Sequence, residues 1–137
     1  MKMLGLDIGD RRIGVAVSDE EMRMARPLAV IDRVNDDSAI AKISETTKEQ
    51  GASVIVYGNP LSLSGRSGRQ AELTSRFAER IGEAAGVPVI PQDERLSSAE
   101  AEKTLIAQGL KREKRRAVID KVAATIILQA YLDGRRD

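Results

Sequence analysis

The alternation of apolar and polar positions predicts three strands near the start of the chain. Leucine or isoleucine at positions 4, 6 and 8 alternates with Gly5 and Asp7, and a period of two is typical of a strand with two different faces. Residues 10–12 then form a turn, and Ile13–Val17 and Pro27–Ile31 are predicted as a second and a third strand. Because the connections are short, we expect an antiparallel meander.

From residue 36 onward, patterns typical of helices and strands alternate. The expected elements are a helix capped by Asp36 or Asp37 and ending at Gly51, a strand at 53–57, a helix at 71–84, a strand beginning within 86–90, a helix from the capping box 97–100 to Gly109, and a last helix from about Ala117 to Asp133. Parallel strands need crossover helices. The sequence therefore predicts an α/β fold: one domain over residues 1–137, with a mixed five-stranded sheet and helices on both faces.

Composition excludes several kinds of chemistry. The chain has no Cys and no His, which removes thiol nucleophiles, Ser-His-Asp triads and the usual zinc sites. One Phe, two Tyr and no Trp argue against binding by base stacking on aromatic platforms. Neither a signal segment nor a membrane span is evident, so we expect a cytoplasmic protein without a membrane partner. Any catalysis must use carboxylates, lysine, hydroxyls or an oxygen-bound metal.

Asp7 is the first candidate for such chemistry, because strand interiors disfavour Asp and a buried charge needs a partner or a metal. Ligand sites in open α/β sheets gather at the carboxyl ends of strands. Asp93 and Glu94 follow the fifth predicted strand and would reach the same edge as Asp7. The spacing does not choose between Asp93 and Glu94.

Asp120 is the third acid, and its place on the last helix follows from about 100° of rotation per residue. It lies roughly 20° beyond Ile127, at the border of the apolar face, whereas Lys121 and Thr125 point away. The residues expected on that face are Val118, Ile119, Val122, Ala123, Ile126, Ile127 and Ala130. Asp120 can thus reach over the edge of the sheet toward Asp7.

Three converging carboxylates repel one another unless cations neutralise them, and such ligands suit Mg²⁺ or Mn²⁺. Two ions roughly 4 Å apart would activate water and stabilise the leaving oxygen of a phosphodiester. The alternative is structural: Asp120 pairs with a neighbouring Lys or Arg, and Asp93 and Glu94 merely precede a helix.

Basic residues flank the three acids and could form a track for nucleic-acid phosphates. A solvated loop is the alternative for the basic segment before the last helix, and an ion pair with Asp93 or Glu100 is the alternative for Arg95. The candidates are Arg11, Arg12, Arg66, Arg69, Arg95, Lys111, Arg112, Lys114, Arg115 and Arg116.

Four motifs in order resemble the YqgF/RuvX family of bacterial ribonuclease H-like nucleases. They are Leu6-Asp7-Ile8-Gly9 with Arg12-Ile13-Gly14-Val15-Ala16, Tyr57-Gly58-Asn59-Pro60-Leu61, Asp93-Glu94-Arg95-Leu96-Ser97-Ser98, and Asp120-Lys121-Val122-Ala123-Ala124 with Ile127-Leu128-Gln129. The resemblance implies a ribonuclease H-like fold, with Asp7, Glu94 and Asp120 at the acidic positions. It also implies a nuclease that matures the 5′ end of 16S ribosomal RNA or cuts four-way DNA junctions. Asn59 departs from the family, many of whose members carry an apolar residue there.

Two other functions remain open at this stage. Asp7-Ile8-Gly9 with Gly14 also resembles the first phosphate motif of actin-like kinases, but 137 residues leave no room for the second lobe that closes over ATP. A nucleic-acid-binding module whose acids hold a structural cation is the other possibility. A monomer and a homodimer are both compatible with the sequence, although cutting two symmetric strands favours a two-fold dimer.

Overall fold

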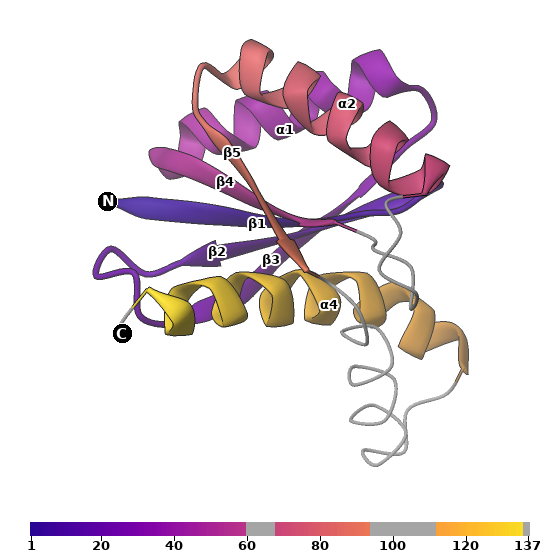
Figure 1. Ribbon diagram of the computed structural model, residues 1–137. Coiled ribbons are helices and arrows are strands. Elements are labelled where there is room, and N and C mark those ends of the chain that lie inside the picture. Colours follow the sequence, from indigo (N-terminus) through magenta and orange to yellow (C-terminus); the bar gives the residue numbers. More distant parts are fainter. Residues whose placement is uncertain (60–67, 94–111, 136–137) are drawn as a thin grey trace.

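The computed structural model describes residues 1–59, 68–93 and 112–135, with residues 93 and 112–121 described by their backbone alone. Five strands form one sheet in the order β3-β2-β1-β4-β5 (Figure 1). Their bounds are Lys2–Ile8 (β1), Arg12–Ser18 (β2), Ala25–Asp32 (β3), Ala52–Asn59 (β4) and Val89–Asp93 (β5). The β1–β2 and β2–β3 pairs are antiparallel, and the β1–β4 and β4–β5 pairs are parallel. The predicted meander followed by parallel strands is confirmed.

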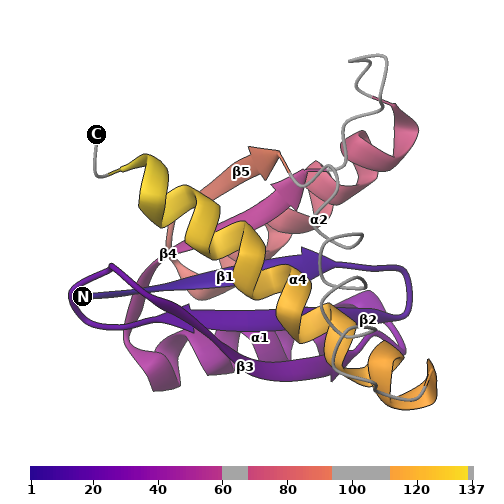
Figure 2. The ribbon, with the colours of Figure 1, turned by 90° about the horizontal axis from the view of Figure 1, so that it is seen from below.

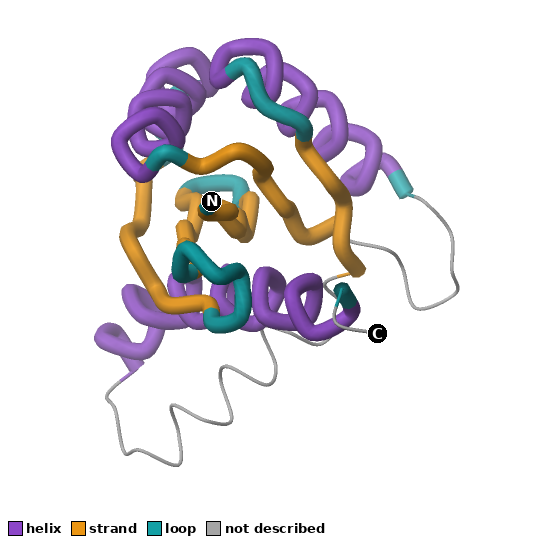
Figure 3. Tube along the Cα trace, turned by 90° about the vertical axis from the view of Figure 1, so that its left-hand side faces the viewer, coloured by secondary structure: helices purple, strands orange, loops and turns teal. Residues whose placement is uncertain are grey.

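Helices cover both faces of this sheet, as expected. Helices α1 (Asp36–Gln50) and α2 (Arg69–Ala85) lie on one face, and α4 (Arg112–Gly134) crosses the other (Figures 1 and 3). The helix expected over residues 97–109 lies outside the described residues. Among the helices that the structure describes, none is long and apolar enough to span a membrane.

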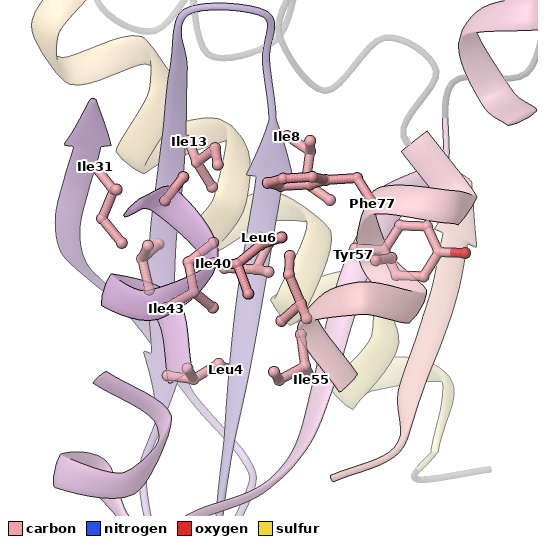
Figure 4. Close-up of a cluster of buried hydrophobic side chains, with 14 of the residues drawn as sticks. Leu4, Leu6, Ile8, Ile13, Ile31, Ile40, Ile43, Ile55, Tyr57 and Phe77 are labelled. Carbon is pink, nitrogen blue, oxygen red and sulfur yellow. The ribbon is translucent and has the colours of Figure 1, made fainter. Parts of the chain in front are cut away.

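The alternation along β1 divides the core into two clusters. Positions 4, 6 and 8 of β1 face α1 and α2, where they pack with Ile40, Ile43 and Phe77 (Figure 4). The other face of the sheet packs against α4, and its buried cluster consists of Met3, Ala16, Val56, Ala124, Ile127, Leu128 and Leu132. Asp7 therefore lies on the same face of β1 as Met3 and Gly5. This is the face of the sheet that α4 covers.

Helix α1 begins with a cap that the sequence analysis assigned to the wrong residue. The side-chain oxygen of Asn35 accepts a hydrogen bond from the backbone N–H of Ser38 at 2.9 Å. Asp36 and Asp37 lie in the first turn instead, where negative charge favours the positive end of the helix dipole. The predicted end at Gly51 is confirmed.

Helix α4 begins at Arg112, not near Ala117, so the prediction of a basic loop up to residue 116 is wrong. Arg, Lys and Glu are good helix formers, and nothing in residues 112–117 stops a helix. The basic residues from Arg112 to Arg116 thus occupy its first turns.

The buried face of α4 also differs from the predicted one. Ala124, Leu128 and Leu132 are fully buried, whereas Ala130, expected on the apolar face, is exposed. On the same wheel the buried arc is centred about 140° further round, because Ala124 and Leu128 lie against Gly5 of β1. The helix position of Asp120 lies within this arc, one turn before Ala124.

One side chain ties α4 to the edge of the meander. The Gln129 side chain accepts a hydrogen bond from the Ala25 N–H at 2.8 Å and donates one to the Arg23 carbonyl oxygen at 2.9 Å. These bonds fix the carboxyl half of α4 across β3.

Candidate active site

Asp7 lies one residue before the end of β1, half-buried on the face that α4 covers. Its partner on β2 is Gly14, and Gly5 precedes it on the same face. The sequence prediction that Asp7 lies on the second face of a strand is confirmed.

Gly5 is the point of closest approach between β1 and α4. A Cβ atom at this position would lie 2.6 Å from the Leu128 Cβ and 3.0 Å from the Ala124 carbonyl oxygen. Only glycine fits at such a contact. The close approach fixes the register between the strand and the helix.

This register determines where the helix position of Asp120 lies. Figure 2 shows α4 running from the end of the sheet where β1 finishes toward the end where β1 begins. From Gly5 to Asp7 the strand advances about 6.6 Å, and from Ala124 back to Asp120 the helix advances about 6 Å. The backbone position of Asp120 therefore lies toward the same end of the sheet as Asp7.

The register of β5 separates the two acids that the sequence left as alternatives. Val89 packs with the hydrophobic cluster under α1 and α2. Asp93 follows four residues later in the strand, so its position belongs to the same face of the sheet. The strand positions of Asp93 and Asp7 therefore belong to opposite faces of the sheet. Glu94 lies outside the described residues.

Asn59 stands beside Asp93, since the two residues are paired across β4 and β5. Its side-chain oxygen is buried and has no hydrogen-bond partner in the described part of the chain. An unsatisfied buried acceptor costs free energy. The departure from the family noted above therefore falls at a position that favours an apolar side chain.

The turn that follows Asp7 is held by a residue that the sequence analysis did not single out. The Gly9 N–H donates to the Arg12 carbonyl oxygen at 3.0 Å, and a Cβ atom at Gly9 would lie 2.7 Å from that oxygen. The Arg33 guanidinium donates to the Gly9 carbonyl oxygen and to Asp36, both at 2.9 Å. It also lies 4.1 Å from the centroid of the Phe77 ring. Arg33 follows a strand like many surface residues, so no sequence pattern marked it.

The predicted basic track is only partly within the described residues. Arg11 is exposed at the hairpin and Arg12 is half-buried, while Arg69 is exposed at the start of α2. Four further candidates belong to the first turns of the α4 backbone: Arg112, Lys114, Arg115 and Arg116. Arg66, Arg95 and Lys111 lie outside the described residues, so a continuous track stays a prediction.

Ser18, the last residue of β2, and Asp19 lie beside the start of β1, at the end of the sheet far from Asp7. The Ser18 hydroxyl accepts a hydrogen bond from the Met3 N–H at 2.9 Å, and Asp19 accepts one from the Arg23 N–H at 2.8 Å. These contacts end a strand and shape a turn.

Within the residues whose side chains are described, no group of three or more acidic side chains gathers as a metal site would require. Of the three acids predicted to bind metal, only the Asp7 side chain belongs to that set. The three-carboxylate centre therefore stays a prediction, supported by the backbone positions of two of its members.

The sequence is similar to those of known proteins. The family model RuvX, described as Holliday junction resolvase, matches residues 1–134. A protein of Chloroflexus aurantiacus named "Putative pre-16S rRNA nuclease" is 49% identical over 134 residues, covering 98% of this chain and 88% of the relative. A protein of Geobacillus kaustophilus with the same name is 44% identical, and the match covers 99% of this chain and 100% of the relative.

Solved structures show the same fold at low identity. Thermus thermophilus RuvC in complex with a Holliday junction substrate has a TM-score of 0.64 at 16% identity, covering 99% of this chain and 96% of RuvC. The Fowlpox virus resolvase in complex with Holliday junction DNA has a TM-score of 0.62 at 11% identity, with full coverage of both chains. The expected ribonuclease H-like fold is confirmed.

Proposed function

The chain belongs to the RuvX family and is a nuclease by that membership, and we propose that it hydrolyses phosphodiester bonds with divalent cations held by Asp7, Glu94 and Asp120. The observation that supports this proposal is the close approach of α4 to β1 at Gly5, with the helix position of Asp120 toward the end of the sheet where Asp7 lies. Asp7 lies half-buried on the face of the sheet that α4 covers, one residue before the end of β1. Carboxylate oxygens are the ligands that Mg²⁺ and Mn²⁺ prefer.

Glu94, and not Asp93, is the proposed third ligand. The pairing of β4 with β5 gives Asp93 the face opposite to Asp7, and residues on opposite faces of a sheet do not share one ion. Two bound Mg²⁺ or Mn²⁺ ions would supply an activated water and positive charge for the leaving oxygen. The role of the three acids is to fix those ions against the strand being cut.

The proposed substrate is the 5′ end of the 16S ribosomal RNA precursor, because relatives 44% and 49% identical are named for that RNA. A protein with this role works in the cytoplasm, and we propose that compartment. The second candidate is a four-way DNA junction, which the description of the matching family favours. Junction cutting would favour a two-fold dimer, whereas RNA processing is open to a monomer.

The test is cleavage of three labelled substrates with Mg²⁺ or Mn²⁺: a 16S precursor 5′ segment, a four-way junction and a duplex of matched length. Asp7→Asn should abolish cutting, and the control Asp32→Asn, which changes an exposed acid on the edge strand β3, should leave it intact. The preferred substrate decides between the two nuclease roles. If the parent binds the substrates but cuts none of them, the chain is a binding module and the proposal is wrong.

A further inference from the structure

Arg33, between β3 and α1, joins the turn that follows Asp7 to the two helices on the opposite face of the sheet. Its guanidinium donates to the Gly9 carbonyl oxygen and to the Asp36 carboxylate of α1, each at 2.9 Å. The same group lies 4.1 Å from the centroid of the Phe77 ring of α2, and the Arg33 side chain is only 18% exposed. Three parts of the fold that are distant in sequence thus meet at one buried cation.

The backbone of the turn is held at two carbonyl oxygens by this one residue. The Arg33 side chain binds the Gly9 oxygen, and the Arg33 N–H donates to the Arg11 carbonyl oxygen at 2.8 Å. The Gly9 N–H closes the turn on itself by donating to the Arg12 carbonyl oxygen at 3.0 Å. Because hydrogen bonds from a charged donor are roughly twice as strong as neutral ones, the guanidinium supplies the stronger of the two contacts from Arg33.

Asp7 belongs to the strand pairs that this turn closes. It is paired with Gly14, and Ile8 is paired with Ile13, and these are the last two pairs of the β1–β2 ladder before the turn. Gly9 follows Asp7 by two residues, so an opening of the turn frees this end of the ladder first and moves the Asp7 carboxylate with it. A metal ligand has to be held within about 0.5 Å of its productive position.

We propose that Arg33 is a positioning residue for the metal site: it holds the Gly9 carbonyl oxygen and thereby fixes the end of β1 that carries Asp7. The inference rests on the proposed function of Asp7 as a metal ligand. Arginine suits this role because its planar fork serves two acceptors at once while its face lies on an aromatic ring. Lysine at this position would keep the charge and lose the fork.

The sign of the effect on metal binding separates positioning from electrostatics. Removing a positive charge near a cation site reduces repulsion, so electrostatics alone predicts equal or tighter Mn²⁺ binding in Arg33→Gln. Loss of positioning predicts weaker Mn²⁺ binding. A role in stability alone predicts a lower melting temperature with unchanged Mn²⁺ affinity in the folded protein.

The first measurement is amide hydrogen exchange, followed by NMR in the metal-free protein. In Arg33→Gln and Arg33→Lys the Gly9 N–H should exchange about tenfold faster than in the parent, as expected from the loss of one charge-assisted hydrogen bond. The Leu6 N–H, in the middle of β1, serves as the reference for global stability. A larger change at Gly9 than at Leu6 identifies a local opening of the turn.

The second measurement is a Mn²⁺ titration followed by electron paramagnetic resonance, at a temperature where each variant is fully folded. Both Arg33 variants should bind Mn²⁺ about tenfold more weakly, at the lower end of the range found when residues that orient metal ligands are changed. The control is Arg80→Gln in the same group of charges, because Arg80 of α2 pairs with Asp36 at 3.8 Å and with Asp37 at 2.6 Å. This control should leave both the Mn²⁺ affinity and the exchange of the Gly9 N–H close to those of the parent.

Faster exchange at Gly9 together with weaker Mn²⁺ binding in both Arg33 variants would support the inference. Unchanged or tighter Mn²⁺ binding in the folded Arg33 variants, or an equal loss of affinity in Arg80→Gln, would overturn it and leave the proposed metal site standing. A parent protein that binds no Mn²⁺ would instead refute the metal site, and the role of Arg33 toward that site would be refuted with it.

Discussion

Replacing Gly5 by Ala tests the contact that sets α4 against β1. The added Cβ would lie 2.6 Å from the Leu128 Cβ, about 1.2 Å inside the usual carbon–carbon contact of about 3.8 Å. The strand cannot retreat, because Leu4 and Leu6 fill its other face and are fully buried. Helix α4 must therefore shift by roughly 1 Å, and overpacking of this kind costs about 1–3 kcal/mol.

Urea unfolding and thermal melting measure this cost. For a chain of 137 residues, 1–3 kcal/mol corresponds to a fall in melting temperature of about 3–10 °C. Cutting should fall further, by about a hundredfold for a 1 Å misplacement of the proposed ligand Asp120, under conditions where the variant is fully folded.

The matched control is Gly134→Ala at the end of the same helix, where an added Cβ meets nothing within 4 Å. This change should be neutral or stabilise the protein by up to about 1 kcal/mol. The reasoning is refuted if Gly5→Ala is as stable and as active as the parent, or if Gly134→Ala is equally destabilising.

Three further substitutions test single contacts by urea unfolding. Gln129→Leu leaves the Ala25 N–H and the Arg23 carbonyl without their partner and should cost about 1–3 kcal/mol; an unchanged midpoint would show that these bonds are not needed. Asn35→Ala should cost about 1 kcal/mol, whereas Asn35→Asp should retain the cap, and equal losses in both variants would contradict the assignment. Asn59→Val removes a buried unpaired oxygen and should be neutral or stabilise by up to about 1 kcal/mol, so a clear loss of stability would indicate a partner for that oxygen.

The sheet could be predicted because its signals are local. Strict alternation at positions 4–8 and the short connections between the first strands define the meander, and crossover lengths define the parallel pairs. The end of α1 at Gly51 was predictable for the same reason. Its beginning was not, since Asn35, Asp36 and Asp37 are all good caps and their sequence does not rank them.

The buried face of helix α4 could not be predicted from the local pattern of residues. Its buried face is set by the meeting of Gly5 with Ala124 and Leu128, a contact between distant parts of the chain. A helical wheel centred on the branched residues of α4 therefore predicted that Ala130 faces the sheet. The same wheel placed Asp120 at the border of the apolar face. Arg33 was missed for the same reason, because its partners Gly9 and Phe77 come from two other elements.

The most direct test of the central claim is a Mn²⁺ titration followed by electron paramagnetic resonance, in the parent and in single-residue variants that remain folded. Asp7→Asn, Glu94→Gln and Asp120→Asn should each lose bound Mn²⁺, and Asp93→Asn should bind like the parent. Undiminished Mn²⁺ binding in Asp7→Asn, or a loss confined to Asp93→Asn, would contradict a metal centre built on the α4 face of the sheet.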